Sequence, residues 1–516
     1  MTENIFPASD FGPMIEKILQ QLTYNPHEPL IFSSSLFLFL FLGFTLVYTL
    51  LQRTQTLRLI FVTAFSYYFY YKSSGFYFFL LALVTVSDFF IARRIATLKE
   101  RNATDDSDYS GSLNGRLKGL VVLSLLIDLG LLGYFKYTNF FAGMWAQMVG
   151  NNFQPWDIFL PVGISFFTFQ SMSYVIDVYR GDLKPLPRLL DYAFYVSFFP
   201  QLVAGPIVRA RDFAPQIRKP LEITKDMFAQ GVYFITIGLF KKAVISDYIS
   251  LNFVDRIFEN PSLYSGVENL LGVYGYTLQI YCDFSGYSDM AIGIALLLGF
   301  RFPMNFNAPY RSESITDFWR RWHISLSSWI RDYIYISLGG NRKGKVRQYV
   351  NLIITMLLGG LWHGASLNFV FWGGMHGVAL ALHKWLRENV FHHDKHYRSS
   401  GLRRVGATLL TFHFVALLWI FFRNHTFEGS WTMLRQIFTD FHPELFLQVV
   451  EGYWFVFALI AFGYLTHFVP ASWERLAVRT LKNGTVILDA VVIAVVIYLV
   501  IQVKSSEIQP FIYFQF

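Results

Sequence analysis

LIFSSSLFLFLFLGFTLVYTLL, residues 30–51, contains no charged side chain and is followed by Gln52 and Arg53. A helix that crosses the hydrocarbon core of a bilayer needs about 20 mostly apolar residues, so this stretch predicts a transmembrane helix. Similar apolar runs recur along the chain, at residues 59–71, 75–92, 119–135, 158–176, 192–208, 228–240, 270–281, 291–300, 352–362, 368–382, 405–422, 453–470 and 485–501. With about a dozen such membrane elements, the sequence predicts an all-α, multi-pass integral membrane protein.

The composition of the whole chain agrees with this class. Of the 516 residues, 54% are hydrophobic and only 15% are charged, and the mean hydropathy is +0.38. Soluble domains carry about 25% charged residues. These values exclude a disordered chain and a nucleic-acid-binding module. The single cysteine, Cys282, excludes an intramolecular disulfide and a cysteine-based metal cluster, and we expect no metal site.

Several apolar runs are too short to cross a membrane alone. Runs near a dozen residues are typical of re-entrant or broken elements, and such backbone survives at membrane depth only beside protein or a water-filled cavity. Gly and Pro punctuate many of these runs, for example at Pro200, Gly205 and Gly359. We therefore expect short re-entrant helices around a polar cavity. We find no internal repeat and no long linker, so residues 1–516 are expected to form one membrane domain.

The basic residues indicate the orientation. The formal net charge is +8, and Lys and Arg cluster after the first and third apolar runs and in later loops, as at Arg342–Arg347. Because cytoplasmic loops are enriched in Lys and Arg, we place these loops in the cytoplasm and the N-terminus outside.

The first candidate for chemistry is the segment Ile315–Tyr335, ITDFWRRWHISLSSWIRDYIY. At 3.6 residues per turn its aromatic and aliphatic residues share one face, and Arg320, Arg321 and other polar residues share the opposite face. This pattern predicts an amphipathic helix at a membrane surface or cavity wall. His323 falls among the aromatic residues, where it is either a packed core histidine or a functional group.

The second candidate is His363, in the segment LIITMLLGGLWHGASLN at 352–368, where it ends a charge-free apolar run. The flanking Gly359, Gly360 and Gly364 allow a second helix or a substrate to approach closely. Burial favours the neutral imidazole, which accepts a proton as a general base must. The alternative is a histidine that only packs helices in a glycine-rich kink.

The third candidate is the segment IYCDFSGYSDMAIG at 280–293, in which Asp283 and Asp289 are carboxylates in apolar surroundings. Intramembrane ionisable residues are functional candidates. They either orient a histidine or line a channel, or they close the bundle through interhelical hydrogen bonds. Cys282 is not expected to act as a nucleophile, because no neighbour in sequence lowers its pKa.

Taken together, three motifs resemble the membrane-bound O-acyltransferase family. They are WRRWHISLS at 319–327, GGLWHG at 359–364 and DFSGYSDMAIG at 283–293; further matches are FPQLVAGPI at 199–207, NFNAPY at 305–310 and FIYFQF at 511–516. The resemblance runs from about residue 158 to 516. Within the family it is similar to the bacterial branch that includes proteins of alginate O-acetylation and of teichoic-acid D-alanylation.

This resemblance implies a ring of transmembrane helices around a central funnel or tunnel, in the bacterial cytoplasmic (inner) membrane. It implies that His363 and His323 are the catalytic histidines and that an acyl group, most simply acetyl, moves from a cytoplasmic thioester to a hydroxyl outside. Acetyl-CoA or an acyl carrier protein would be the donor, with no tightly bound cofactor, and a periplasmic or extracellular partner protein would assist beside membrane lipid. We add as candidate substrate-binding residues Trp319, Arg320, Arg321, Trp362, Asp283, Asp289, Asn305 and Asn307.

Other functions stay open at this point. A transporter for polysaccharide or lipid-linked sugar also needs many membrane helices and intramembrane carboxylates. The paired histidine motifs and the lack of a repeat favour the enzyme. Within the enzyme class, D-alanyl transfer and transfer of a long acyl chain to a lipid are alternatives to acetylation of a polysaccharide.

Overall fold

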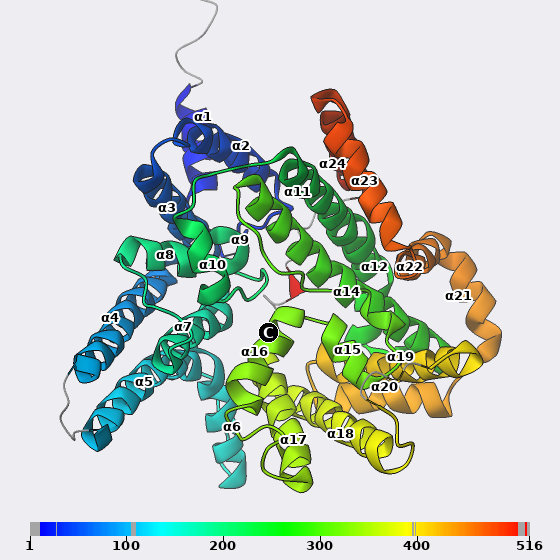
Figure 1. Cartoon of the computed structure of the whole chain (residues 1–516). Helices are drawn as coiled ribbons and strands as arrows, with labels where there is room; N and C mark the ends of the chain where they lie inside the picture. Colours follow the sequence, from blue (N-terminus) through cyan, green and yellow to red (C-terminus); the bar gives the residue numbers. More distant parts are fainter. Residues whose placement is uncertain are drawn as a thin grey trace, which may run out of the picture. The chain divides into compact units, whose positions relative to one another are not determined.

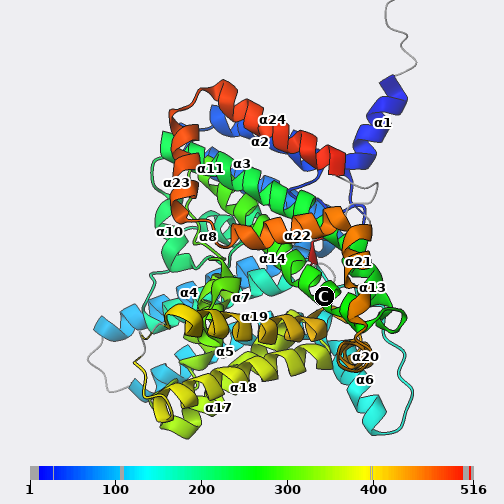
Figure 2. The ribbon, with the colours of Figure 1, turned by 90° about the vertical axis from the view of Figure 1, so that its right-hand side faces the viewer.

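The computed structural model describes residues 11–26, 28–104, 110–394, 397, 399–503 and 511–512. Every regular element in those residues is a helix, and no strand occurs among them (Figures 1 and 2). The all-α prediction is therefore confirmed. The chain divides into two compact units, residues 1–130, 159–203 and 210–220 in the first, and residues 131–158, 204–209 and 221–516 in the second. The expectation of a single membrane domain stays a prediction.

The first unit is built mainly from the N-terminal helices. These are α1 (Phe11–Leu22), α2 (Ser35–Leu50), α3 (Gln55–Ser74), η1 (Gly75–Tyr77), α4 (Phe78–Thr104), α5 (Ser110–Leu132), α7 (Ile164–Arg180), α8 (Leu189–Ser197), α9 (Phe199–Leu202) and α10 (Ala210–Ile217). The buried ring of Phe199 lies 5.1 Å from that of Phe65 and 5.5 Å from that of Phe44, and its backbone N–H donates to Ser66 at 3.1 Å. An aromatic core thus fixes the short helix α9.

Two boundaries in the first unit differ from the sequence prediction. The opening apolar run forms a helix of 16 residues, because the Ser34 hydroxyl accepts a hydrogen bond from the N–H of Phe37 at 3.2 Å and caps the helix there. The predicted apolar runs at 75–92 and 119–135 are parts of longer helices, since α4 continues to Thr104 and α5 begins at Ser110.

The second unit holds the remaining helices. They are η2 (Gly133–Tyr137), α6 (Thr138–Met148), α11 (Lys225–Leu239), η3 (Phe240–Ser246), α12 (Asp247–Ile249), η4 (Ser250–Val254), α13 (Asp255–Glu259), η5 (Pro261–Leu263), α14 (Gly266–Leu297), η6 (Pro309–Arg311), α15 (Ile315–Arg321), α16 (Ile324–Ile330), η7 (Arg331–Tyr335), α17 (Lys345–His363), α18 (Leu367–Asn389), α19 (Gly401–Arg423), α20 (Phe427–Thr439), η8 (Pro443–Leu445), α21 (Phe446–Gly452), α22 (Trp454–Thr466), α23 (Ala471–Asn483) and α24 (Val486–Val503).

The centre of the second unit is the buried helix α14, which runs beside α11 (Figure 1). The two backbones touch at glycines: a Cβ on Gly238 would lie 2.6 Å from the carbonyl oxygen of Gly286, and one on Gly293 would lie 2.7 Å from that of Gly231. Small residues at such contacts are typical of membrane helix pairs. The prediction of two separate membrane elements at 270–281 and 291–300 is therefore wrong. The polar residues between these runs lie inside one helix of 32 residues.

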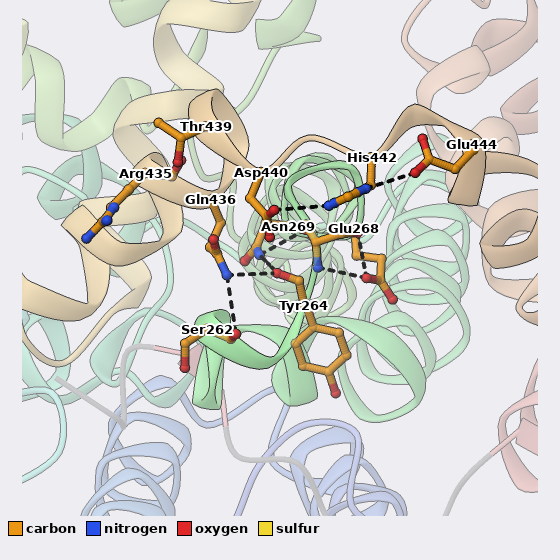
Figure 3. Close-up of polar contacts among 11 residues, drawn as sticks. Ser262, Tyr264, Glu268, Asn269, Arg435, Gln436, Thr439, Asp440, His442 and Glu444 are labelled. Carbon is orange, nitrogen blue, oxygen red and sulfur yellow. Dashed lines mark hydrogen bonds and ion pairs between the residues drawn. The ribbon is translucent and has the colours of Figure 1, made fainter.

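The start of α14 is fixed to the end of α20 by a polar corner (Figure 3), where the N–H of Gly266 donates to the carbonyl oxygen of Asp440 at 2.7 Å. The side chain of Glu268 accepts hydrogen bonds from the N–H and hydroxyl of Ser265 at 2.9 and 2.6 Å, which completes a capping box. The exposed ring of His442 joins two carboxylates, with Nδ1 2.8 Å from Glu444 and Nε2 3.0 Å from Asp440. These bonds, first to Glu444 and then to Asp440, raise the pKa of His442 above its ordinary value.

By length and composition, four helical runs of the described chain are long and apolar enough to cross a membrane: Gln55–Arg101, Leu113–Met148, Lys225–Glu259 and Gly401–Arg423. A fifth candidate, the pair Pro443–Gly452 and Trp454–Thr466, is bent by 96° between its helices. The number of helices long enough to span a membrane is therefore smaller than the dozen membrane elements predicted from the apolar runs. The apolar helices Ser35–Leu50 and Ile487–Gln502 are shorter than these spans.

Candidate active site

A cavity of about 500 Å³ lies in the second unit among α15, α16, η7, α17 and α18. Its described lining holds one histidine and a set of basic residues, namely His363, Arg320, Arg331, Lys384 and Arg387. Most other lining residues are apolar or aromatic, such as Trp319, Met356 and Trp372. The cavity therefore combines a proton-accepting side chain with positive charge in a largely apolar wall.

His363 is the last residue of α17 and is 3% exposed. Its ring lies 5.2 Å from that of Trp372 and 5.1 Å from that of Phe422. The glycines before it permit a close helix pair, as predicted. A Cβ on Gly360 would lie only 2.2 Å from the carbonyl oxygen of Phe369 in α18. Figure 2 shows α17 and α18 side by side, and this packing holds the histidine at the cavity wall.

Two residues that the sequence did not single out fix the end of α17. The Nζ of Lys136 donates hydrogen bonds to the carbonyl oxygens of Trp362 at 2.6 Å and His363 at 2.9 Å, and the hydroxyl of Tyr137 donates to that of Leu361 at 2.8 Å. The last carbonyls of a helix have no partner within the helix, and a cation there also meets the negative end of the helix dipole. Both residues come from the π-helix η2, a type that often marks functional sites.

His323 interrupts the helix that the sequence predicted over Ile315–Tyr335. Its φ is 43°, in the left-handed region, and it separates α15 from α16. Asn305 stabilises the break, because its backbone oxygen accepts from the N–H of Ile324 at 2.9 Å and its side-chain oxygen accepts from the N–H of Ser325 at 3.2 Å. The prediction of a single amphipathic helix over this segment is therefore wrong. The expected aromatic surroundings are present, since the ring of Phe284 lies 4.6 Å away.

The two predicted histidines meet through a tryptophan. His323 is fully buried and is not part of the cavity lining described above. The ring of Trp362 lies 6.0 Å from the ring of His323 and 4.9 Å from that of His363. Only His363 of this pair lines the cavity, and the ring of His323 packs against Trp362.

The residues of α15 divide between the cavity and a salt bridge. Trp319 and Arg320 line the cavity, and the indole N–H of Trp319 donates to Nδ1 of His376 at 3.3 Å. Arg321 instead pairs with Asp317 at 2.9 Å and donates to the carbonyl of Asn307 at 3.3 Å. Arg321 and Asn307 thus tie the loop before α15 to the end of that helix.

Asp283 and Asp289 both pair with lysines of η3. Asp283 lies 2.5 Å from Nζ of Lys242, and its other oxygen accepts from the N–H of Ile512 at 3.0 Å. Asp289 lies 2.7 Å from Nζ of Lys241. Neither carboxylate lines the cavity of His363, and this arrangement corresponds to the interhelical bonding that the sequence left as an alternative. Of the motif at 511–516, only Phe511 and Ile512 lie within the described residues.

The charges beside the cavity are partly neutralised. Arg331 and Arg209 each lie 2.6 Å from a different oxygen of Asp332. Burial opposes the ionisation of Asp332, but hydrogen bonds from Arg331 and Arg209 hold the pKa of this carboxyl below its ordinary value. Arg387 lies 3.3 Å from Glu388. Arg320 has no ion pair within the part of the chain that the structure describes, so it retains its charge for a bound anion.

Comparison with known proteins identifies the family. The family model described as membrane-bound O-acyltransferase matches residues 182–383, which include His323 and His363. A probable alginate O-acetylase from Pseudomonas aeruginosa is 41% identical over 80% of this chain and 75% of that protein. A peptidoglycan O-acetyltransferase from Helicobacter pylori is 38% identical over 61% of this chain and 64% of its own length. A teichoic acid D-alanyltransferase from Bacillus subtilis is 32% identical over 52% of this chain and 69% of its own length. The chain belongs to the membrane-bound O-acyltransferase family and is a multi-pass membrane acyltransferase.

Proposed function

We propose that this enzyme moves an acetyl group from a cytoplasmic thioester to a hydroxyl of an exported polysaccharide, directly or through a partner protein outside the membrane. The observation that carries the proposal is the joint placement of His363 and four basic residues around one cavity. The relatives named as alginate O-acetylase and peptidoglycan O-acetyltransferase support acetyl as the group and a polysaccharide as the acceptor.

His363 is proposed as the general base. It takes the proton of the acceptor hydroxyl while the hydroxyl oxygen attacks the thioester carbonyl. An ester C–O bond forms, the C–S bond breaks, and the proton passes from the imidazole to the leaving thiolate. No covalent acyl-enzyme is required. Because Lys136 and Tyr137 hold the end of α17, the ring is positioned before the substrates arrive, and such preorganisation lowers the barrier.

His323 is proposed as a positioning residue. Its ring contacts Trp362 rather than the cavity, so it acts on the reaction by fixing the tryptophan beside His363. A role in stabilising the developing oxyanion would require His323 to reach the cavity, which it does not line, so we favour the positioning role.

The donor is proposed to bind through its phosphates. Arg320 and Arg331 line the cavity together with Lys384 and Arg387, and guanidinium groups match phosphate oxygens geometrically. Acetyl-CoA and a carrier protein with a phosphate-linked thiol arm both satisfy this requirement. Arg321, which the sequence suggested for the same role, is used by Asp317 and lies outside the lining.

The location follows from the same chemistry. We propose that the enzyme lies in the bacterial cytoplasmic membrane with its basic loops in the cytoplasm and its N-terminus outside. Thioester donors are cytoplasmic and exported polymers are not, so the acyl group has to cross the bilayer. A second candidate is D-alanyl transfer, which the teichoic acid D-alanyltransferase among the relatives favours.

Membranes with the cytoplasmic face accessible test the proposal. They receive acetyl-labelled acetyl-CoA, and labelled polymer or partner protein is measured at matched enzyme levels. We expect labelling with the parent and with His425→Ala, an exposed loop histidine, and none with His363→Ala or the larger His363→Gln. Equal labelling in all four contradicts the assignment of His363. Labelling only after D-alanyl carrier protein replaces acetyl-CoA selects the second candidate.

A further inference from the structure

A second hollow in the same unit shares no lining residue with the cavity of His363. It is a groove of about 750 Å³ lined by α11, the C-terminal part of α14, the loop after it and α23. Figure 2 shows α23 beside α11, and the two helices are in contact. The apolar part of the groove includes Phe234, Ile292, Leu296 and Phe302.

The groove carries more positive than negative charge. Its lining contains four basic residues, Arg301, Arg475, Arg479 and Lys482, against the carboxylates of Asp226 and Glu474. Lys482 lies 3.4 Å from Asp226, and Gln230 donates to the same carboxylate at 2.7 Å. Arg475 and Arg479 are one helical turn apart and form no ion pair with the residues that the structure describes. Two adjacent guanidinium groups in this setting favour an anion with several oxygens, such as a phosphate.

The helix that carries these arginines has the character of a membrane-surface helix. Trp473 and Leu476 lie away from the groove and are 67% and 63% exposed. A helix with exposed apolar residues on one side and arginines on the other lies in the plane of the membrane interface, and tryptophan is enriched at that depth. An interfacial position of this helix would bring the arginine pair to the level of the lipid phosphates.

We propose that Arg475 and Arg479 bind the phosphate of an anionic membrane phospholipid, with its hydrocarbon against the apolar part of the groove. The chemistry recognised is a phosphate, which a lipid headgroup or a soluble phosphate ester can supply. The amphipathic character of α23 favours the lipid.

Native mass spectrometry of the full-length protein in detergent tests this site. The probes are phosphatidylglycerol, phosphatidylcholine and glycerol 3-phosphate. The test variant is Arg475→Gln with Arg479→Gln. The control is Arg435→Gln with Arg347→Gln, which removes the same charge from two exposed helix positions elsewhere. We expect the test variant to bind phosphatidylglycerol roughly thirty-fold more weakly, the effect of two basic residues near an anionic surface, and the control variant to match the parent.

Further arms separate the sources and the role of charge. The variant Arg475→Lys with Arg479→Lys keeps both charges and is expected to retain most of the binding, with elution from a sizing column as the check on folding. If glycerol 3-phosphate binds as well as phosphatidylglycerol and displaces it, the site recognises a phosphate but the proposal of a lipid ligand is overturned. Phosphatidylcholine binding that equals phosphatidylglycerol binding would overturn the anionic preference. Equal binding of phosphatidylglycerol by the parent and the glutamine variant would overturn the site.

Discussion

Replacement of Lys136 by methionine removes two hydrogen bonds at the end of the helix that carries His363. Methionine keeps a flexible, unbranched side chain that is one atom shorter, and it has no donor. The carbonyl oxygens of Trp362 and His363, which lie 2.6 and 2.9 Å from Nζ in the parent, lose this partner. The hydroxyl of Tyr137 still reaches the carbonyl of Leu361, so the helix end is held at one point instead of three.

The size of the effect follows from these contacts. A hydrogen bond from a charged donor contributes about 1.5–3 kcal/mol, and a neutral one contributes about 1 kcal/mol. We expect Lys136→Met to lower the free energy of unfolding by about 3 kcal/mol and Tyr137→Phe by about 1 kcal/mol. A displacement of His363 by roughly 1 Å costs about 100-fold in rate, which is about 2.7 kcal/mol in activation free energy. We therefore expect acyl transfer to fall about 100-fold even when equal amounts of folded protein are compared.

The assay is the rate of labelled acetyl transfer in membranes, at matched protein levels, with thermal unfolding in detergent measured in parallel. The loss is expected in kcat rather than in KM for the donor, because Lys136 does not line the donor cavity. Lys136→Arg retains the donors and the charge and is expected to restore much of the activity. A transfer rate for Lys136→Met within about two-fold of the parent, or no lower than that of Tyr137→Phe, would refute the reasoning.

Three further predictions concern other parts of the second unit. Gly360→Ala is expected to lower the free energy of unfolding by about 3 kcal/mol, because the new Cβ would lie 2.2 Å from the carbonyl oxygen of Phe369. Gly359→Ala is the control, since a Cβ on Gly359 meets only a side-chain methyl at 3.3 Å. Similar thermal midpoints for the two variants would contradict this prediction. Asparagine tolerates the left-handed backbone conformation at position 323, so His323→Asn is expected to elute as a folded protein. Its rate of acyl transfer is expected to fall roughly ten-fold, because Trp362 loses the ring that packs against it. An unchanged rate would show that the His323 ring has no positioning role. The pKa of His442 is raised in the folded state, so the stabilising contribution of its charge is complete below about pH 6.5 and is lost as the pH rises through the higher folded-state pKa. An NMR titration is expected to give a pKa above about 6.5 for His442 in the parent and a pKa closer to 6.5 in Glu444→Gln. A pKa at or below about 6.5 in the parent would contradict the geometry.

The class of the fold and the histidine that lines the cavity could be predicted from local sequence. Long charge-free runs require helices in a bilayer, and the histidine of GGLWHG stands beside glycines that the structure uses for a contact with α18. These features depend on residues close together in the chain. The family resemblance was likewise carried by short motifs, and comparison confirmed it.

Features that depend on distant partners were missed. Lys136 precedes Trp362 by 226 residues in the chain, and nothing in its own neighbourhood indicates a role at the end of α17. The break at His323 depends on Asn305, which takes over the N–H groups at the start of α16. Helical periodicity depends only on the spacing of residues within a segment, so it predicted one continuous helix there. The opposite error occurred in α14, where Lys241 and Lys242 neutralise Asp289 and Asp283 and let the helix continue.

The structure separates the rigid and the adaptable parts of the proposed active site. His363 is held by the Gly360 contact with α18 and by the hydrogen bonds from Lys136, all within well-packed helices. Arg331, by contrast, is 63% exposed in its side chain although it pairs with Asp332. Relatives named for acetyl transfer and for D-alanyl transfer both match this chain, and the mechanism proposed above applies to either acyl group. We propose that the rigid end of α17 serves the chemical step in both cases. The exposed cations are therefore the positions at which exchange of side chains should alter donor choice without loss of the chemical step.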